Sequence, residues 1–202
     1  MDKYIHIHIG LDDTDHLESD CTTKNFNELL NYLADYIKFT ILSRKLVRLW
    51  PFANRRTRGN AALSGVIEIN MKDEERLYNI SNDWFKKLLI NISSHPPCNS
   101  PASPVLVISR YIFSEKIYWD TVKGHVDLST RLNEIKEYEC KVYAGESYWG
   151  LIGASAAISW VPNENHSYEL IAWRKRSMIG KKRIIDIKTI TELDRKFPKT
   201  FV

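Results

Sequence analysis

The chain has 202 residues, of which 44% are hydrophobic and 27% are charged, and its formal net charge is +4 at pH 7. This composition is sufficient to build a hydrophobic core and is ordinary for a soluble protein, and the length suits one large domain or two small ones. The mild basic excess is compatible with a nucleic-acid or nucleotide partner, and it fits an ordinary globular protein equally well.

The apolar runs and the cysteines predict a cytoplasmic protein with no membrane partner. No apolar run approaches the roughly 18 residues that a membrane span requires. The first residues, MDKYIHIH, lack the apolar core of a signal peptide. The three cysteines lie far apart and form no CxxC pair, which indicates a reducing compartment and argues against a zinc knuckle.

The N-terminal part of the chain predicts a strand, an acidic loop and a helix, in that order. Residues 4–11 alternate and are rich in isoleucine, which is typical of a strand with Ile5, Ile7 and Ile9 on one face. Residues 22–41 carry apolar side chains at intervals of three and four, which predicts an amphipathic helix. The start of such a helix exposes unpaired N–H groups and is a natural phosphate site.

The remaining elements alternate between strands and helices. We expect strands at 46–49, 61–69, 105–109, 139–143 and 168–174, helices at 73–92, at 120–137 and from residue 150, a loop rich in proline and serine at 93–104, and a short strand and helical turn within 183–201.

The acidic loop holds three carboxylates, Asp12, Asp13 and Asp15, directly after the first strand. Mg²⁺ takes carboxylate oxygens and substrate phosphates as ligands. Clustered carboxylates also repel each other unless a cation neutralises them. The spacing alone leaves two interpretations open, an acidic turn before a helix or a site for metal and phosphate.

The loop before the 61–69 strand carries Arg55, Arg56 and Arg58, followed by Gly59 and Asn60. Arginine offers a rigid fork of donors to phosphate oxygens, and glycine lets the backbone approach a ligand. A solvated basic hairpin is the alternative. An acidic metal holder and a basic phosphate holder in one chain are the pairing that phosphoryl or nucleotidyl transfer needs.

Two further segments complete the candidate site. Thr22 and Thr23 stand at the predicted helix start, where a hydroxyl group can meet a phosphate. The segment GLIGASAA places Gly150, Gly153 and Ala154 where small residues either line a ligand pocket or permit tight helix packing. It is neither a Walker A loop nor a dinucleotide fingerprint.

Motifs in these segments occur in a fixed order over nearly the whole chain: IGLDDTD followed by CTT, LVRLWP, RTRGNAA, GLIGASAAI and YELIAWR. In them the chain resembles archaeal agmatidine synthase, the tRNA 2-agmatinylcytidine synthetase family (TiaS). The chain departs from the usual family pattern at Arg56, where the family has Lys, and at Trp149, where it has Arg. It also has Ser19-Asp20 in place of Gly-Met.

The resemblance implies an α+β (α/β) fold, with a kinase-like α/β domain that binds ATP over residues 1–115 and a ferredoxin-like α+β domain over residues 116–202. It implies ATP and Mg²⁺ as cofactors, and the isoleucine tRNA with a CAU anticodon and agmatine as partners. The implied reaction activates the 2-oxygen of the wobble cytidine by phosphorylation, so that agmatine can replace it.

The resemblance also assigns roles to the candidate residues. The catalytic group comprises Asp12, Asp13, Asp15 and Thr22, with Asp12 and Asp13 as metal ligands and Thr22 as the hydroxyl that becomes phosphorylated. ATP or its phosphates would contact Thr23, Arg56, Arg58, Gly59 and Asn60, and Gly150, Gly153 and Ala154 would line the pocket for agmatine or substrate. The alternative is a non-catalytic or split paralogue that binds nucleotide or tRNA and needs a separate tRNA-binding chain carrying an OB-fold and a zinc ribbon.

Overall fold

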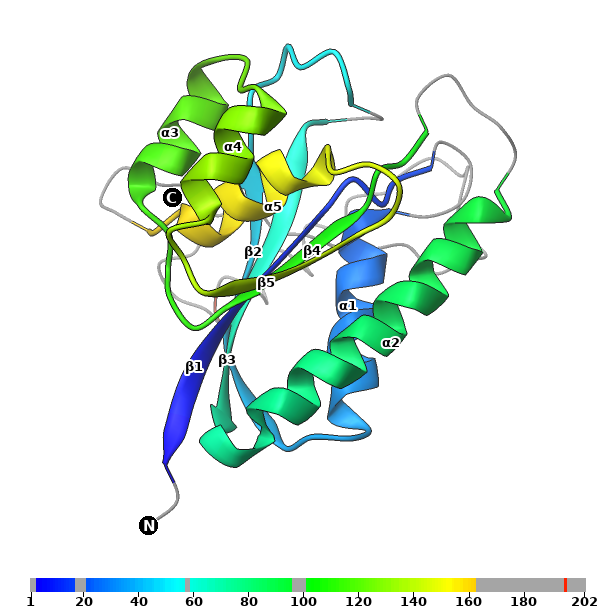
Figure 1. Cartoon of the computed structure of the whole chain (residues 1–202), viewed down its shortest axis with the longest axis vertical. Helices are drawn as coiled ribbons and strands as arrows, with labels where there is room; N and C mark the ends of the chain where they lie inside the picture. Colours follow the sequence, from blue (N-terminus) through cyan, green and yellow to red (C-terminus); the bar gives the residue numbers. More distant parts are fainter. Residues whose placement is uncertain (1–2, 17–20, 57–58, 96–100, 163–194, 196–202) are drawn as a thin grey trace. The chain divides into compact units, whose positions relative to one another are not determined.

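The computed structural model describes residues 3–16, 21–56, 59–95, 101–162 and 195 (Figure 1). The chain divides into a compact unit over Met1–Val161 and a second unit over Pro162–Val202. The strand predicted at 168–174 and the elements predicted within 183–201 lie outside the described residues. In the described ranges, no helix combines the length and the apolar character needed to cross a membrane.

The first unit is built on one antiparallel sheet. Its strands stand in the order β2-β3-β1-β4-β5, and each pairs antiparallel with its neighbours. Their bounds are β1 Tyr4–Asp12, β2 Phe39–Arg48, β3 Ala61–Asn70, β4 Val105–Ser109 and β5 Cys140–Ala144. The 61–69, 105–109 and 139–143 strand predictions are thereby confirmed, with their ends shifted by at most one residue.

Helices cover both faces of this sheet (Figure 1). One face carries α1 (Thr22–Ala34) and α2 (Glu74–Ser93), the latter entered through the short 3₁₀ helix η1 (Met71–Asp73). The other face carries α3 (Glu115–Lys123), α4 (Leu128–Ile135) and α5 (Gly150–Ser159). An antiparallel sheet with helices on both faces confirms the α+β class. The division into a kinase-like and a ferredoxin-like domain near residue 115 stays a prediction.

The alternation of β1 explains why the sheet is covered on both sides. The sequence pattern predicted Ile5, Ile7 and Ile9 on one face; Ile7 and Ile9 are fully buried in the core with α1 and α2, and Ile5 is partly buried against the same core. On the opposite face, a Cβ atom at Gly10 would lie 2.3 Å from the carbonyl oxygen of Ala154. Glycine is therefore required at this position, because α5 packs its backbone directly onto β1. A second close approach, of Gly150 to the Asp12 carbonyl oxygen, places the start of α5 over the end of β1.

Two sequence predictions of helices are wrong in their extent. The predicted 22–41 helix ends at Ala34, and the chain from Phe39 onward forms β2, which pairs with β3 over its whole length. The aromatic and β-branched residues 39–41 satisfy their backbone groups in the sheet, so tertiary pairing overrides the helical spacing. The predicted 120–137 helix is two helices, α3 and α4, separated at Gly124, whose backbone is extended.

Candidate functional site

A cleft of about 320 Å³ opens where β1 ends, next to the starts of α1 and α5. Four segments build its walls: the acidic loop, the arginine loop after β2, the connection between α3 and α4, and the first turn of α5. The side chains that carry charge or hydrogen-bonding groups into it include Asp12, Asp13, Asp15, Thr22, Asn54, Arg55, Arg56, Asn60, Thr121, His125 and Trp149.

The acidic loop makes a sharp turn that the backbone around it holds in place. Asp13 has φ of 55°, in the left-handed region that aspartate tolerates better than most residues. Its carboxylate accepts a hydrogen bond from the backbone N–H of Ser103, in the segment before β4. Behind it, the buried Thr14 hydroxyl accepts a hydrogen bond of 2.9 Å from Asn25 Nδ2 of α1. The turn therefore aims successive carboxylates into the cleft.

The carboxylates of this loop crowd one another. Burial raises the pKa of Asp12 well above its ordinary value, and the charges of Asp13 and Asp15 raise it further. Burial likewise raises the pKa of Asp13 to about 6, although the guanidinium of Arg55 opposes this rise. A divalent cation between Asp12 and Asp13 would relieve both effects. The donor set therefore fits Mg²⁺.

The chemistry of this donor set, two neighbouring carboxylates, is of the kind that Mg²⁺ takes from proteins. Mg²⁺ commonly binds one or two protein carboxylates and completes its octahedron with water and phosphate oxygens. Across the residues that the structure describes, no group of three or more His, Cys, Asp or Glu side chains is arranged to hold a metal ion. A cation at Asp12 and Asp13 would thus need further oxygen ligands from a bound substrate.

Asp15 is joined to the first residue of α1. Its Oδ1 accepts hydrogen bonds from the Thr22 backbone N–H at 2.5 Å and from the Thr22 hydroxyl at 2.8 Å. Within the described part of the chain, the side chain of Cys21, the residue before the helix, makes no capping hydrogen bond. Asp15 therefore caps α1 from seven residues upstream of Thr22. The same contact orients the Thr22 hydroxyl and gives its proton an acceptor.

The arginine loop brings two of its predicted arginines, Arg55 and Arg56, into the cleft wall. Arg55 lines the cleft, donates to the carbonyl oxygen of Pro101 at 3.2 Å, and lies over the Trp149 ring with its Cζ 5.5 Å from the ring centroid. Arg56 also lines the cleft and donates to the carbonyl oxygen of Ala53 at 3.1 Å.

The end of the same loop turns back onto its beginning. Gly59 and Asn60 line the cleft, and Asn60 Nδ2 donates to the carbonyl oxygen of Trp50 at 2.8 Å. The Leu49 backbone N–H donates to the carbonyl oxygen of Asn60 at 3.0 Å. These bonds fasten the two ends of the loop together. Arg58, which the sequence also assigned to phosphate binding, lies outside the described residues.

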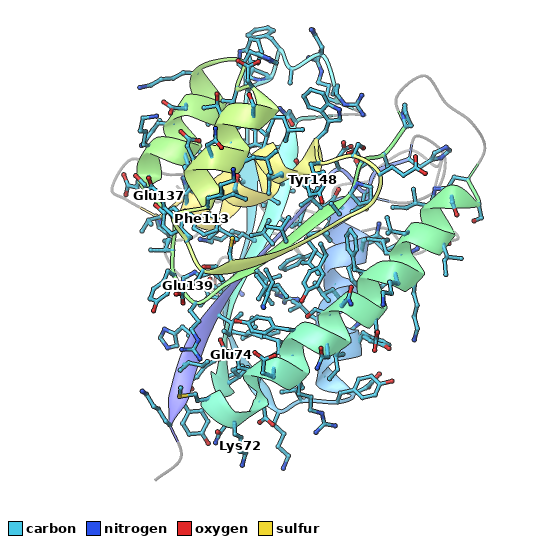
Figure 2. The ribbon with its side chains drawn as sticks, in the orientation of Figure 1. Lys72, Glu74, Phe113, Glu137, Glu139 and Tyr148 are labelled. Atoms are coloured by element: carbon cyan, nitrogen blue, oxygen red, sulfur yellow. The ribbon has the colours of Figure 1, made fainter. Side chains whose placement is uncertain are left out.

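The glycines at the start of α5 let this helix press against the acidic loop. A Cβ atom at Gly153 would lie 1.9 Å from Asp12 Oδ2, and one at Gly150 would lie 2.9 Å from the Asp12 carbonyl oxygen. Figure 2 labels Tyr148 just before this helix start. Gly153 lines the cleft, whereas Gly150 and Ala154 are buried in the packing contact. The small-residue segment thus serves packing and the cleft wall at once.

The structure brings most of the predicted site residues into this one cleft. Those present in its wall are Asp12, Asp13, Asp15, Thr22, Arg56, Gly59, Asn60 and Gly153. Thr23 is half-buried on α1 and lies outside the cleft wall as far as the described residues define it.

Several residues of the cleft had no assigned role in the sequence. Arg55 stood within the arginine run but was not distinguished from its neighbours, and Ser103 lay in a loop without a motif. Thr121 reaches the cleft from the last turn of α3, and Gly124 and His125 reach it from the α3–α4 connection. No local pattern marks these three, because tertiary packing alone carries them there.

The α+β fold brings clustered carboxylates, a helix N-terminus and arginines into one cleft, and these groups are chemically suited to a phosphate ester. Comparison with known families identifies the family of this chain. The family model of the TiaS TCKD domain matches residues 8–147, and that of the TiaS FLD domain matches residues 133–202. The chain belongs to the TiaS family.

Curated relatives carry the same family name. The chain is 31% identical to the isoleucine-tRNA 2-agmatinylcytidine synthetase TiaS of Methanocaldococcus jannaschii, over 96% of this chain and 46% of that protein. It is 30% identical to the enzyme of the same name from Pyrococcus horikoshii, over 95% of this chain and 44% of that protein. The chain thus spans less than half the length of these curated relatives, and it matches an N-terminal part of TiaS.

Solved structures share the fold. A TiaS complex with an isoleucine tRNA and ATP superposes with a TM-score of 0.73 at 24% identity, covering 96% of this chain and 45% of that chain. A TiaS complex with the same tRNA, AMPCPP and agmatine gives a TM-score of 0.68 at 22% identity, covering 96% of this chain and 46% of that chain. At these identities the likeness concerns the fold.

Proposed function

We propose that this chain is the catalytic region of an ATP-dependent tRNA-modifying ligase of the cytoplasm. In this proposal it activates the 2-oxygen of the wobble cytidine in the isoleucine tRNA with a CAU anticodon, by phosphorylation, for replacement by agmatine. Family membership supports the proposal, and so do the names of the relatives, which are isoleucine-tRNA agmatinylcytidine synthetases. One observation carries it at the level of residues: the Thr22 hydroxyl donates to Asp15 in a cleft that also holds Asp12 and Asp13.

The chemistry asks for phosphate activation before substitution. A cytosine carbonyl oxygen is a poor leaving group until it is phosphorylated. When bound, ATP would supply the phosphoryl group, and Mg²⁺ would supply positive charge that neutralises the phosphate oxygens. The groups required of the protein are therefore carboxylates for the cation, arginines for developing phosphate charge, and an acceptor for each proton released.

The described residues suit these roles. Asp12 and Asp13 would hold the cation, because a nearby positive charge favours the ionised form of each buried carboxylate. Arg55 and Arg56 would face phosphate oxygens from the opposite wall. Asp15 would take the proton of the Thr22 hydroxyl as that oxygen bonds to the terminal phosphorus of ATP and the bond from that phosphorus to ADP breaks. The positive end of the α1 dipole would favour the phosphate formed on Thr22.

Mass spectrometry of the chain incubated with Mg²⁺ and ATP tests the proposal. We expect one phosphate on Thr22, none in Thr22→Ala, and an unchanged level in Thr23→Ala. Asp15→Asn should slow phosphorylation while ATP still binds, because the amide keeps the size of the carboxylate but cannot take a proton. A folded chain that shows no ATP binding by calorimetry at millimolar nucleotide would refute the proposal. Binding without phosphorylation would favour the non-catalytic alternative.

A further inference from the structure

One wall of the cleft is aromatic and cationic, and the proposed phosphate chemistry uses its arginines but leaves its tryptophan without a role. Trp149, immediately before α5, lines the cleft with 38% of its surface exposed. Trp84, by comparison, packs in the main core at 7% exposure. A large indole left this exposed in a cleft gains less from burial than a core tryptophan, so packing alone does not account for its position.

The Arg55 guanidinium covers part of this wall. Its Cζ lies 5.5 Å from the centroid of the Trp149 ring, a distance at which a cation is attracted to the ring. Arg55 Nη2 also donates to the carbonyl oxygen of Pro101, and its charge opposes the rise in the pKa of Asp13. Arg55 thus links the aromatic wall to the carboxylates.

Both members of the pair are anchored to the same short segment before β4. The Trp149 backbone N–H donates to Ser103 Oγ at 3.1 Å, and Ser103 Oγ shares a hydrogen bond of 2.6 Å with Ser147 Oγ. Pro101, two residues earlier, holds the Arg55 guanidinium. The indole and the guanidinium are therefore positioned before any ligand enters, which lowers the entropy that binding would cost.

We propose that Trp149 and Arg55 form a stacking subsite for a nucleobase. Flat aromatic rings and guanidinium planes are the groups on which proteins stack unpaired bases, because every base has a π face. This inference rests on the proposed function for the presence of a nucleotide or RNA in the cleft, and it deepens that function by naming the side chains that hold a base. Adenine of ATP and an unpaired cytosine of RNA share the required chemistry.

Titrations of the 202-residue chain with three probes separate these sources. The probes are ATP, inorganic tripolyphosphate, which has the phosphates without a base, and a short single-stranded oligonucleotide rich in cytidine. Trp149→Ala should weaken a probe whose base stacks here by about 5- to 150-fold, the range found when a base-stacking aromatic is removed. Tripolyphosphate affinity should not change, and Trp149→Phe should keep most of the affinity for the base.

Trp119→Ala is the matched control. Trp119 lies on α3, is 42% exposed, and stacks edge-on with Tyr118, so the substitution removes an equally exposed indole away from the described cleft wall. We expect all three affinities to be unchanged in this variant. Thermal unfolding of each variant checks that the fold is intact.

Each outcome bears on the inference. Weakened ATP binding with unchanged tripolyphosphate binding supports an adenine subsite, and a loss confined to the oligonucleotide supports an RNA base. Unchanged affinities for ATP and the oligonucleotide in Trp149→Ala overturn the inference, as does an equal loss of tripolyphosphate. If the wild-type chain binds neither ATP nor tripolyphosphate but binds the oligonucleotide through Trp149, the proposed function fails and the stacking subsite stands.

Discussion

Replacing Gly153 by alanine should destabilise the protein, although the same change inside an ordinary helix stabilises it. Alanine is favoured over glycine in a helix interior by about 1 kcal/mol. Here the added Cβ atom would lie 1.9 Å from Asp12 Oδ2 and 2.7 Å from Asp12 Cγ, well inside the 3.4 Å at which ordinary contacts begin. Either the carboxylate must rotate away or α5 must shift.

The magnitude follows from these two opposing effects. Inserting a methyl group into a packed site typically costs about 1–3 kcal/mol. After the helix preference is subtracted, the free energy of unfolding should fall by up to about 2 kcal/mol. A change of that size lowers the melting temperature of a chain this long by roughly 4–8 °C. Rotation of the Asp12 carboxylate should also weaken Mg²⁺-dependent ATP binding by about tenfold or more, since a tenfold loss needs only about 1.4 kcal/mol.

Urea unfolding of four proteins measures this coupling: wild type, Gly153→Ala, Asp12→Ala and the double variant. Once Asp12 is alanine, the remaining close contact is Leu49 Cδ1 at 3.0 Å, the flexible end of a side chain. The glycine substitution should then be neutral or stabilising, which gives a coupling free energy equal to the steric cost, about 1–3 kcal/mol. Gly124→Ala is the control for stability, because a Cβ atom there meets nothing within 4 Å. Equal effects of Gly153→Ala in both backgrounds would refute the steric argument.

Three further predictions concern charge and capping. Asp13→Asn should stabilise the ligand-free protein at pH 7. The pKa of Asp13 is about 6 in the folded protein and 3.8 ordinarily, so the wild type loses stability as the pH rises through this interval and Asp13 ionises. At pH 7 this loss should be about 2–3 kcal/mol in the free energy of unfolding, and the variant should avoid it. Melting curves of both proteins from pH 4 to 7 test this prediction. The lowered pKa of His8, about 4, makes both proteins more stable as the pH rises, and this shared effect cancels when the two curves are subtracted. Parallel curves for the two proteins would contradict the prediction. Asp15→Ala should cost about 1 kcal/mol in urea unfolding through the lost cap on Thr22, whereas Asp15→Asn should cost less, and equal losses would argue against capping. Arg131→Ala should lower the free energy of unfolding by about 3 kcal/mol, because the fully buried guanidinium donates to Thr121 Oγ1 and Ser155 Oγ at 2.9 Å each. A loss below about 0.5 kcal/mol, typical of a surface substitution, would show that these buried hydrogen bonds do not stabilise the fold.

The sequence by itself determined the elements whose signals are local. The alternation of Ile5, Ile7 and Ile9 predicts the core-facing side of β1, since successive strand residues point to opposite sides of the sheet, and Ile7 and Ile9 are fully buried there. The carboxylates that follow, and the helix that starts at Thr22, are likewise visible from adjacent residues. The sequence order of strand, carboxylates and helix, together with the TiaS family motifs, was enough to predict the acidic side of the cleft, which Asp12, Asp13, Asp15 and Thr22 form.

Tertiary structure decided everything that depends on contacts between distant segments. Residues 39–41 carry apolar spacing compatible with a helix, and only pairing with β3 makes them a strand. Three arginines close together in the sequence are equivalent in charge, and only the neighbouring Pro101 and Trp149 distinguish Arg55. The physical reason is the same in each case: sequence spacing fixes which side chains share a face of one element, whereas the energy that chooses among alternatives comes from partners tens of residues away.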